Sequence, residues 1–145
     1  MILKIGSFIA FGIALVGLVY LINKNYILSQ NPIAIVLQLG SIAFMIWARI
    51  TFGLRSFHFT ANTTKGELVT TGPYRWLRHP IYAAVIYFSL ASVISYPYID
   101  TIIAFILISG GLFVRMLLEE KSLLLTYDNY AEYSKHTKRI IPYIF

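Results

Sequence analysis

The chain has no cysteine among its 145 residues, and charged residues make up only 12% of it. Without cysteine it can form neither a disulfide bond nor a thiolate metal site. Its three histidines, His58, His79 and His136, are far apart in the sequence. That spacing disfavours a zinc site, and we expect no metal. A charge content this low is unusual for a soluble domain of this size.

In place of charge the chain has long apolar runs, and 58% of its residues are hydrophobic. Runs of about 20 apolar residues are what the hydrocarbon core of a bilayer requires. The formal net charge of +6 would suit nucleic-acid binding, but no soluble basic face is available to carry it. In membrane proteins, basic residues gather on the cytoplasmic side and beside anionic headgroups. We therefore expect an integral membrane protein that contacts membrane lipids and binds no nucleic acid.

Four apolar segments predict an all-α membrane protein with one domain over residues 1–145. The expected transmembrane helices are two N-terminal spans and a C-terminal helical hairpin, at residues 2–22, 32–54, 81–96 and 99–118. No small-residue cleavage site follows the first segment, which favours a retained anchor over a signal peptide. The last two segments are joined by a tight turn at Tyr96-Pro97-Tyr98, so they should be antiparallel neighbours.

The distribution of lysine and arginine predicts the orientation in the membrane. With four spans, eleven of the twelve basic residues fall on one side, and only Lys24 falls on the other. The positive-inside rule then places both termini and the central loop in the cytoplasm. Beyond the last span, apolar and aromatic residues recur at helical spacing from Leu123 to Ser134. This pattern predicts an amphipathic helix over residues 119–141, lying on the membrane surface or folded back on the loop.

The loop before the third span is the only long polar interruption, and residues 68–82 read LVTTGPYRWLRHPIY. Pro80 suits the first position of a helix, and His79 suits its cap. The N-terminus of a helix offers unpaired N–H groups that favour an anion, and Arg75 and Arg78 add positive charge. The arginines alone would also suit an interfacial anchor. The His79-Pro80 pair, with a tyrosine on either side, favours a binding site.

A second polar cluster is expected where the fourth span ends. Arg115 and Glu119 are four residues apart and share one helix face, so a salt bridge is their simplest role. Glu119 and Glu120 should occupy the last helical turn, where carboxylates are disfavoured. We therefore expect a compensating partner, either a cationic ligand or hydroxyl donors such as those of a ribose. Because a hairpin brings its two ends together, both clusters should form one site that suits a zwitterionic molecule.

The loop sequence, together with RMLLEEKSLLLTYDNYAEYSKHTKRIIP downstream, resembles the isoprenylcysteine carboxyl methyltransferase family. That family consists of integral membrane enzymes that use S-adenosylmethionine (SAM). The resemblance covers residues 66–142, whereas the first half of the chain is similar only in having two spans. One departure is Asp128, which stands where the family has a glycine, and the tail is one residue shorter there.

The resemblance implies a site that binds SAM and leaves S-adenosylhomocysteine as the product of methyl transfer. The residues implied to bind this cofactor are Gly66, Glu67, Leu68, Val69, Tyr74, His79, Pro80, Ile81, Tyr82 and Glu119. Arg115 is implied to bind the substrate, and Arg115 and Glu119 are implied to be catalytic.

The implied reaction is O-methylation of the carboxylate of a prenylated cysteine, or of a similar lipophilic acceptor that enters from the bilayer. A carboxylate, with a reference pKa of about 3.5, is ionised at neutral pH and needs no general base. An amine, with a pKa of about 10, must first lose a proton, and Glu119 or Glu120 would be the candidate base. Phospholipid amine N-methylation and thiol S-methylation therefore remain alternatives. Two alternatives outside the methyltransferases are a small four-helix transporter and an NADPH-dependent membrane reductase.

Overall fold

The computed structural model describes residues 2–53 and 68–145, and its elements are helices. In chain order they are α1 (Ile2–Asn23), α2 (Pro32–Phe52), the 3-10 helix η2 (Gly72–Arg75), α3 (Pro80–Ser95), α4 (Ile99–Thr126) and α5 (Tyr130–His136). The prediction of an all-helical protein is therefore confirmed for the described residues.

Three of these helices are long and apolar enough to cross a membrane. The candidate spans within the described ranges are Leu3–Asn23, Pro32–Phe52 and Ile99–Thr126. Helix α3 is apolar but has only 16 residues, a length of about 24 Å, against a hydrocarbon core of about 30 Å. Large apolar side chains on these helices face outward, for example Val36 at 70% exposed and Ile50 at 75%. The protein is thus a multi-pass membrane protein, and four spans remain a prediction.

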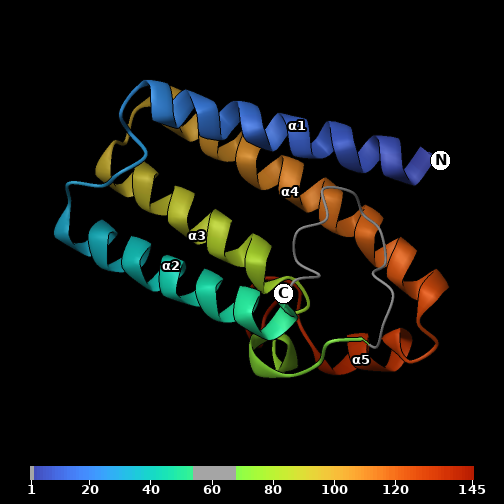
Figure 1. The fold of residues 1–145 in the computed structure, drawn as a ribbon. Coiled ribbons are helices and arrows are strands. Elements are labelled where there is room, and N and C mark those ends of the chain that lie inside the picture. Colours follow the sequence, from blue (N-terminus) through green and yellow to red (C-terminus); the bar gives the residue numbers. More distant parts are fainter. Residues whose placement is uncertain (1, 54–67) are drawn as a thin grey trace.

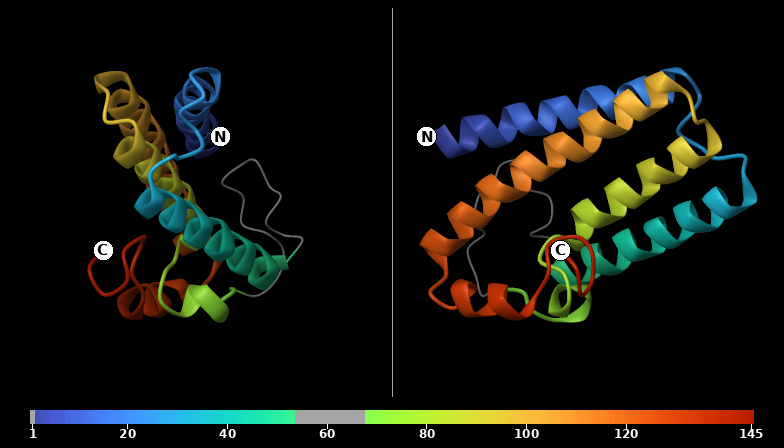
Figure 2. Two further views of the ribbon diagram at one scale, coloured as in Figure 1. Left: turned by 90° about the vertical axis from the view of Figure 1, so that its left-hand side faces the viewer. Right: turned by 180° about the vertical axis from the view of Figure 1, so that it is seen from behind.

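The four long helices form two antiparallel pairs (Figure 1). Helix α1 lies along α4, and α2 lies along α3, while the α3–α4 hairpin joins the two pairs. The views in Figure 2 show the same arrangement from two further sides. The start of α1, the end of α2, the start of α3 and the end of α4 all lie toward the end of the bundle that carries α5. Both predicted polar clusters therefore lie at one end.

Small residues let the backbones of α1 and α4 approach closely. A Cβ atom added at Gly17 would meet the Ala104 carbonyl oxygen at 2.6 Å. One added at Gly111 would meet the Ala10 carbonyl oxygen at 2.5 Å and the Ala14 nitrogen at 2.9 Å. Helices in membranes associate through this kind of close backbone packing. An alanine at either glycine would therefore push α1 away from α4.

At the opposite end of the bundle, hydrogen bonds fix the connection between α1 and α2. The Gln38 side chain donates to the Ile27 carbonyl at 2.8 Å and accepts from the Ser29 N–H at 3.0 Å. The Ser95 hydroxyl oxygen, at the end of α3, accepts from the backbone N–H groups of Gln30 and Asn31. These bonds tie the connection to both α2 and α3, as buried backbone groups require.

The C-terminal part differs from its prediction in two ways. Helix α4 continues to Thr126, eight residues beyond the expected end at 118, because the leucine-rich run after Glu120 extends the helix. The expected amphipathic helix over 119–141 is instead the end of α4, a break, the short helix α5 and an extended tail. Glu119 and Glu120 consequently lie two turns inside α4. The argument that a helix end requires a partner for them is wrong.

Candidate functional site

The GPY turn of η2 is packed against the end of α2. Gly72 has a φ of +56°, and a Cβ there would meet the Thr51 hydroxyl oxygen at 2.6 Å. Glycine alone fits this position, since it tolerates positive φ and leaves room for the close contact. Pro73 and Tyr74 are buried, and the Tyr74 ring lies 5.4 Å from that of Phe52. The turn therefore fixes the loop before α3 against a second helix.

Backbone hydrogen bonds join this loop to the tail after α5. The N–H of Arg78 donates to the Lys138 carbonyl at 2.7 Å, and the N–H of Lys138 donates to the Trp76 carbonyl at 2.9 Å. The N–H of His79 donates to the Arg139 carbonyl at 3.1 Å. Leu77 and Lys138 thereby form a parallel β-bridge. The segment before α3 and the tail from 138 to 139 are one unit, although about 60 residues separate them in sequence.

Glu120 holds this unit to α4 through two arginines. Its carboxylate accepts from the Arg78 Nε–H at 2.9 Å and from the Arg139 Nη2–H at 3.0 Å. Arg78 also donates to the carbonyls of Ser134 and Thr137. The Arg78 and Glu120 side chains are 9% and 11% exposed. Two positive charges thus neutralise one buried carboxylate. Arg78 therefore connects α4 to the segment after α5 and stabilises the fold.

A second chain of polar contacts links α3 to α4. The Arg115 Nε–H donates to the Tyr82 hydroxyl at 2.9 Å, and that hydroxyl donates to Glu119 Oε2 at 2.6 Å. Arg115 is only 5% exposed, and its guanidinium lies 4.9 Å from the centre of the Phe11 ring on α1. A buried cation over an aromatic face is stabilised by the ring quadrupole. Tyr82 therefore links a guanidinium and a carboxylate in a largely water-free setting.

His79 lies at the cap position of α3, but its side chain makes no capping hydrogen bond. Its ring is parallel to that of Tyr82, with ring centres 5.5 Å apart. The Nε2 atom approaches Glu120 Oε1 to 3.4 Å, close enough for charge attraction. That approach is not aligned as a hydrogen bond, so Nε2 is buried without a hydrogen-bond partner. His79 is 6% exposed, so water has little access to it.

Tyr130 of α5 has a second buried polar atom without a partner. The side chain is 2% exposed, and its hydroxyl makes no hydrogen bond. Burial, with a smaller contribution from Glu120, raises the pKa of Tyr130, so the hydroxyl stays protonated and can donate. Leaving a buried polar group unsatisfied costs about 1–3 kcal/mol. Among the described residues, Ser7 Oγ and Thr101 Oγ1 also lack a partner, but His79 and Tyr130 are the two that lie beside the polar contacts of Glu119 and Glu120, where a bound ligand would satisfy them.

Tyr133, one turn away, differs from Tyr130 because its hydroxyl has a partner. That hydroxyl donates to the Tyr74 carbonyl at 2.6 Å. Burial raises the pKa of Tyr133 to about 12. Burial and the nearby Glu119 carboxylate also raise the pKa of Tyr74. Tyr74 therefore lies within electrostatic reach of Glu119.

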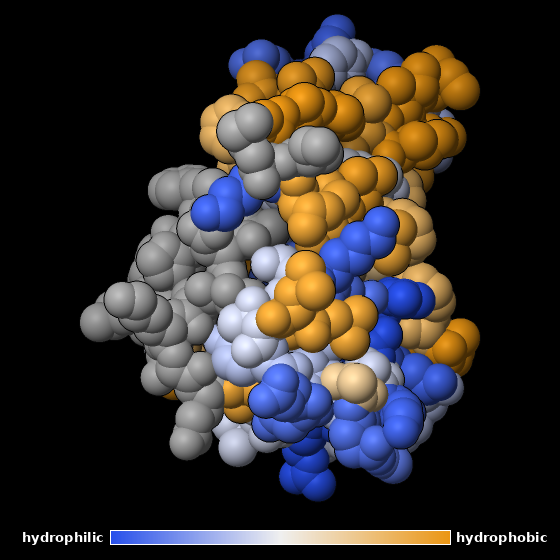
Figure 3. All heavy atoms as spheres, turned by 90° about the vertical axis from the view of Figure 1, so that its right-hand side faces the viewer, coloured by the Kyte–Doolittle hydropathy of each residue, from blue (hydrophilic) through white to orange (hydrophobic). Residues whose placement is uncertain are grey.

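The structure brings most of the predicted site residues together. Tyr82 contacts His79, Arg115 and Glu119 directly. The remaining predicted residues that the structure describes are Leu68, Val69, Tyr74, Pro80 and Ile81, in or beside the loop before α3. Gly66 and Glu67 lie outside the described residues. Figure 3 shows this end of the molecule, with hydrophilic side chains gathered over the lower part and hydrophobic ones over much of the upper part.

Comparison with known sequences identifies the family of this chain. The sequence profile of the isoprenylcysteine carboxyl methyltransferase (ICMT) family matches residues 31–125, more than half of the chain. The chain belongs to this family. A protein-S-isoprenylcysteine O-methyltransferase from Xenopus laevis is 30% identical over 101 residues, which are 67% of this chain and 35% of the relative. The chain thus spans about a third of the length of that relative. No solved structure matches the chain.

Sequence reasoning missed several residues of this candidate site. Glu120 and Arg139 were not assigned to a pair, and Arg78 was interpreted as part of an anion site or an anchor. One signal was available, because consecutive residues on a helix point about 100° apart. Two adjacent glutamates must therefore meet different partners. Tyr130 and Arg139 lie beyond the range that the family profile matches.

Proposed function

We propose that this chain is a membrane-embedded, SAM-dependent methyltransferase that O-methylates the carboxylate of a prenylated cysteine or a similar lipophilic acceptor. Family membership and the name of the Xenopus laevis relative support this activity. The observation that carries the proposal is the contact chain from Arg115 through Tyr82 to Glu119. It lies beside two buried polar atoms that lack partners. S-adenosylhomocysteine would be the second product.

The cofactor site comprises the loop before α3, the first turn of α3, and α4 at Glu119. We assign to it the residues Gly66, Glu67, Leu68, Val69, Tyr74, His79, Pro80, Ile81, Tyr82 and Glu119, and we add Tyr130. The donor set fits SAM. The N-terminus of α3 favours the carboxylate of the amino-acid part, and Glu119 can accept from its ammonium or from ribose hydroxyls. His79 Nε2 and the Tyr130 hydroxyl would both gain a partner.

SAM supplies a methyl group that is already activated by attachment to a sulfonium, so the protein mainly has to align the acceptor. Arg115 is the residue we assign to this task. Its planar guanidinium has five N–H donors that match a carboxylate. It can therefore orient the acceptor while its Nε–H donates to Tyr82. Because Arg115 is buried, few water molecules compete with the acceptor oxygen as nucleophile.

The buried guanidinium also favours a carboxylate over an amine as acceptor. An amine must lose a proton before attack, and Glu119 would then serve as the base. However, Arg115 would repel the ammonium form of such an acceptor on its way to the site. A carboxylate gains from the same charge, and it needs no base.

We further propose that α3 is a fourth span and that both ends of the chain and the cofactor site face the cytoplasm. The positive-inside pattern supports this orientation. The short α3 begins within the protein-lined polar site and does not itself have to cross the headgroup layer. The chain lacks cysteine, so single cysteines can report sidedness. A cysteine at Lys135 should react with a membrane-impermeant maleimide only after right-side-out cells are opened, and one at Lys24 should react before.

The first test of the activity is SAM binding by the full chain in lipid nanodiscs, measured by calorimetry and by the rise in melting temperature. SAM should bind and stabilise the protein, whereas NADPH should do neither. Absence of binding at millimolar SAM would overturn the proposal. Labelled SAM should then transfer its methyl group to acetyl-farnesyl-cysteine and not to phosphatidylethanolamine. Transfer to phosphatidylethanolamine alone would show the amine activity instead.

A further inference from the structure

Residues 140–145, IIPYIF, contact both helices of the α3–α4 hairpin. We call this segment the apolar hook. The Phe145 ring stacks on Phe113 of α4, with ring centres 6.1 Å apart. The Tyr87 hydroxyl of α3 donates to the Ile140 carbonyl. Tyr87 is five residues beyond Tyr82, or about 7.5 Å further along α3. The hook therefore lies beside the apolar part of the hairpin.

The hook exposes apolar side chains in a region where the neighbouring helices do the same. Tyr143 is 85% exposed, Ile144 is 75% exposed and Ile141 is 39% exposed. Phe113 and Val114 on the adjacent face of α4 are 39% and 48% exposed. Adjoining exposed apolar surfaces of this kind mark an interaction site. Because Phe145 stacks on Phe113, the apolar side chains of the hook lie beside a candidate membrane span.

The hook also pairs most of its backbone N–H groups within itself, and irregular backbone in hydrocarbon requires such pairing. The N–H groups of Ile140 and Ile141 donate to the Phe145 carbonyl at 2.9 and 2.7 Å. The N–H groups of Ile144 and Phe145 donate to the Ile141 carbonyl at 3.2 and 3.1 Å. Pro142 has no N–H to satisfy.

The turn of the hook adopts an unfavourable backbone conformation. Tyr143 has a φ of +65°, which is rare for a bulky residue and costs about 1–3 kcal/mol. Such a conformation persists only where surrounding contacts fix it. Those contacts are the stacking of Phe145 on Phe113 and the Arg139 guanidinium, 5.1 Å from the Phe145 ring centre.

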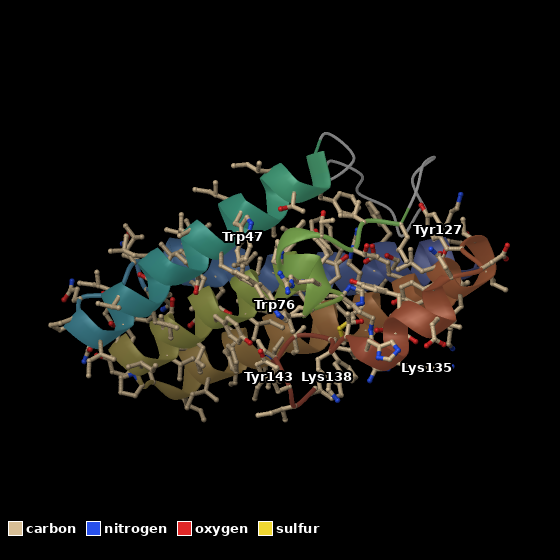
Figure 4. The ribbon with its side chains drawn as sticks, turned by 90° about the horizontal axis from the view of Figure 1, so that it is seen from below. Trp47, Trp76, Tyr127, Lys135, Lys138 and Tyr143 are labelled. Atoms are coloured by element: carbon tan, nitrogen blue, oxygen red, sulfur yellow. The ribbon has the colours of Figure 1, made fainter. Side chains whose placement is uncertain are left out.

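We propose that the apolar hook inserts into the hydrocarbon edge of the bilayer and thereby holds the tail against the cofactor site. Lys138, two residues before the hook, is exposed and would lie among the headgroups, where basic residues are favoured. Figure 4 shows Lys138 and Tyr143 near each other, on the side of the bundle away from Trp47. The tail pairs with the loop at Arg78 and His79. Membrane contact at Ile144 would therefore stabilise the site.

Insertion is tested by spin labels on single cysteines in nanodiscs, without any ligand. The label positions are Ile144 in the hook, Ile106 on the outer face of α4, and Lys138. Labels at Ile144 and Ile106 should collide with oxygen more than with a water-soluble nickel complex, and the label at Lys138 should do the reverse. A label at Ile144 that meets the nickel complex as readily as Lys138 would overturn the proposal. A label at Ile144 that meets neither oxygen nor the nickel complex would also overturn the proposal, because it would indicate that a second copy of the chain covers the hook.

Coupling to the site is tested with Ile144→Glu and the matched variant Ile33→Glu, because both isoleucines are 75% exposed. Ile33 lies in the first turn of α2, at the opposite end of the bundle. Ile144→Glu should weaken SAM binding at least about fivefold, since a smaller fraction of molecules keeps the tail in place. Ile33→Glu should leave it unchanged. Equal SAM affinity in both variants would overturn the coupling.

This coupling rests on the proposed function, whereas the depth measurement does not. If the wild-type protein fails to bind SAM, the proposed function fails while the insertion result stands. If the wild-type protein binds SAM but the label at Ile144 collides mainly with the nickel complex, the hook proposal fails and the proposed function stands.

Discussion

Glu119 and Glu120 are neighbours on one helix, yet their surroundings differ in kind. Glu120 accepts hydrogen bonds from two arginines, and its side chain is 11% exposed. Glu119 accepts from the Tyr82 hydroxyl and lies in the same contact chain as Arg115. The Glu120 carboxylate joins three segments of the chain, which are α4, the loop before α3 and the tail. The Glu119 carboxylate belongs to the contact chain of the candidate site. The difference teaches that paired acids in a motif need not share a role.

The same contrast extends to the residues around each glutamate. The Glu120 cluster offsets its own charges and needs no ligand to do so. The His79 ring stacks on Tyr82, the partner of Glu119, and its Nε2 atom has no hydrogen-bond partner although it lies 3.4 Å from Glu120 Oε1. The buried Tyr130 hydroxyl also has none. Natural proteins satisfy most buried polar groups, so exceptions of this kind mark places where a bound molecule can complete the structure. Variants of the two glutamates should therefore affect different measurements.

The largest effect on stability is expected for Glu120→Gln. This change keeps the shape but leaves the Arg78 and Arg139 charges without a carboxylate. Removing one member of a buried ion pair costs about 3–5 kcal/mol, and we expect about 3 because Arg139 is 31% exposed. Unfolding in nanodiscs would measure it. Glu132→Gln is the control, since that side chain is 63% exposed and its ion pairs contribute little. Equal losses in both variants would contradict the role of Glu120.

Glu119→Gln should instead weaken SAM binding and spare the fold. A hydrogen bond to a charged group contributes about 1.5–3 kcal/mol, so we expect a loss of at least about tenfold in affinity by calorimetry. The melting temperature without ligand should stay near that of the wild type, because glutamine can still accept from Tyr82. A variant with normal SAM affinity but low stability would reverse the comparison.

Arg115→Lys should act on the acceptor and not on the cofactor. Lysine keeps the charge but loses the planar pair of donors that a carboxylate fits. We expect kcat/KM for acetyl-farnesyl-cysteine to fall about tenfold, a change of about 1.4 kcal/mol, with SAM affinity unchanged. If SAM affinity falls in parallel, Arg115 belongs to the cofactor site and our assignment of its role is wrong.

The smallest effects, but opposite in sign, are expected for the two tyrosines of α5. Tyr130→Phe removes a buried hydroxyl without a partner, so the ligand-free protein should gain about 1 kcal/mol while SAM binds about fivefold less tightly. Tyr133→Phe removes the hydrogen bond to Tyr74, so stability should fall by about 1 kcal/mol with SAM affinity kept. If Tyr130→Phe and Tyr133→Phe change stability in the same direction and also change SAM affinity by the same factor, Tyr130 is not a ligand contact.

Much of the fold could be predicted because apolar runs and turn residues are local signals. Pro32 and Pro80 begin α2 and α3, as proline at the first helical turn predicts. The end of α4 could not be predicted, because the leucines after Glu120 suit a continued helix and a surface helix equally. The hook was missed for a related reason. A short apolar run after a proline does not reveal what it packs against.

The candidate site was predicted in part because the hairpin makes its two clusters adjacent whatever their detailed contacts. The meeting of Tyr82 with Glu119 and Arg115 follows from that topology. The pairing of Glu120 with Arg139 could not be derived, since it depends on the tail returning to the loop before α3. Backbone pairing between residues about 60 positions apart leaves no periodic trace in a sequence. The assignments of SAM contacts remain predictions.

Helix α1 precedes the range that the family profile matches, yet Phe11 on α1 lies over the Arg115 guanidinium. The acceptor site that we propose at Arg115 therefore includes a part of the chain that the shared motif does not specify. Related enzymes could recognise different acceptors by varying this first helix while keeping the nucleoside pocket intact. A chimera carrying the first helix of another family member should then change acceptor preference without altering SAM affinity.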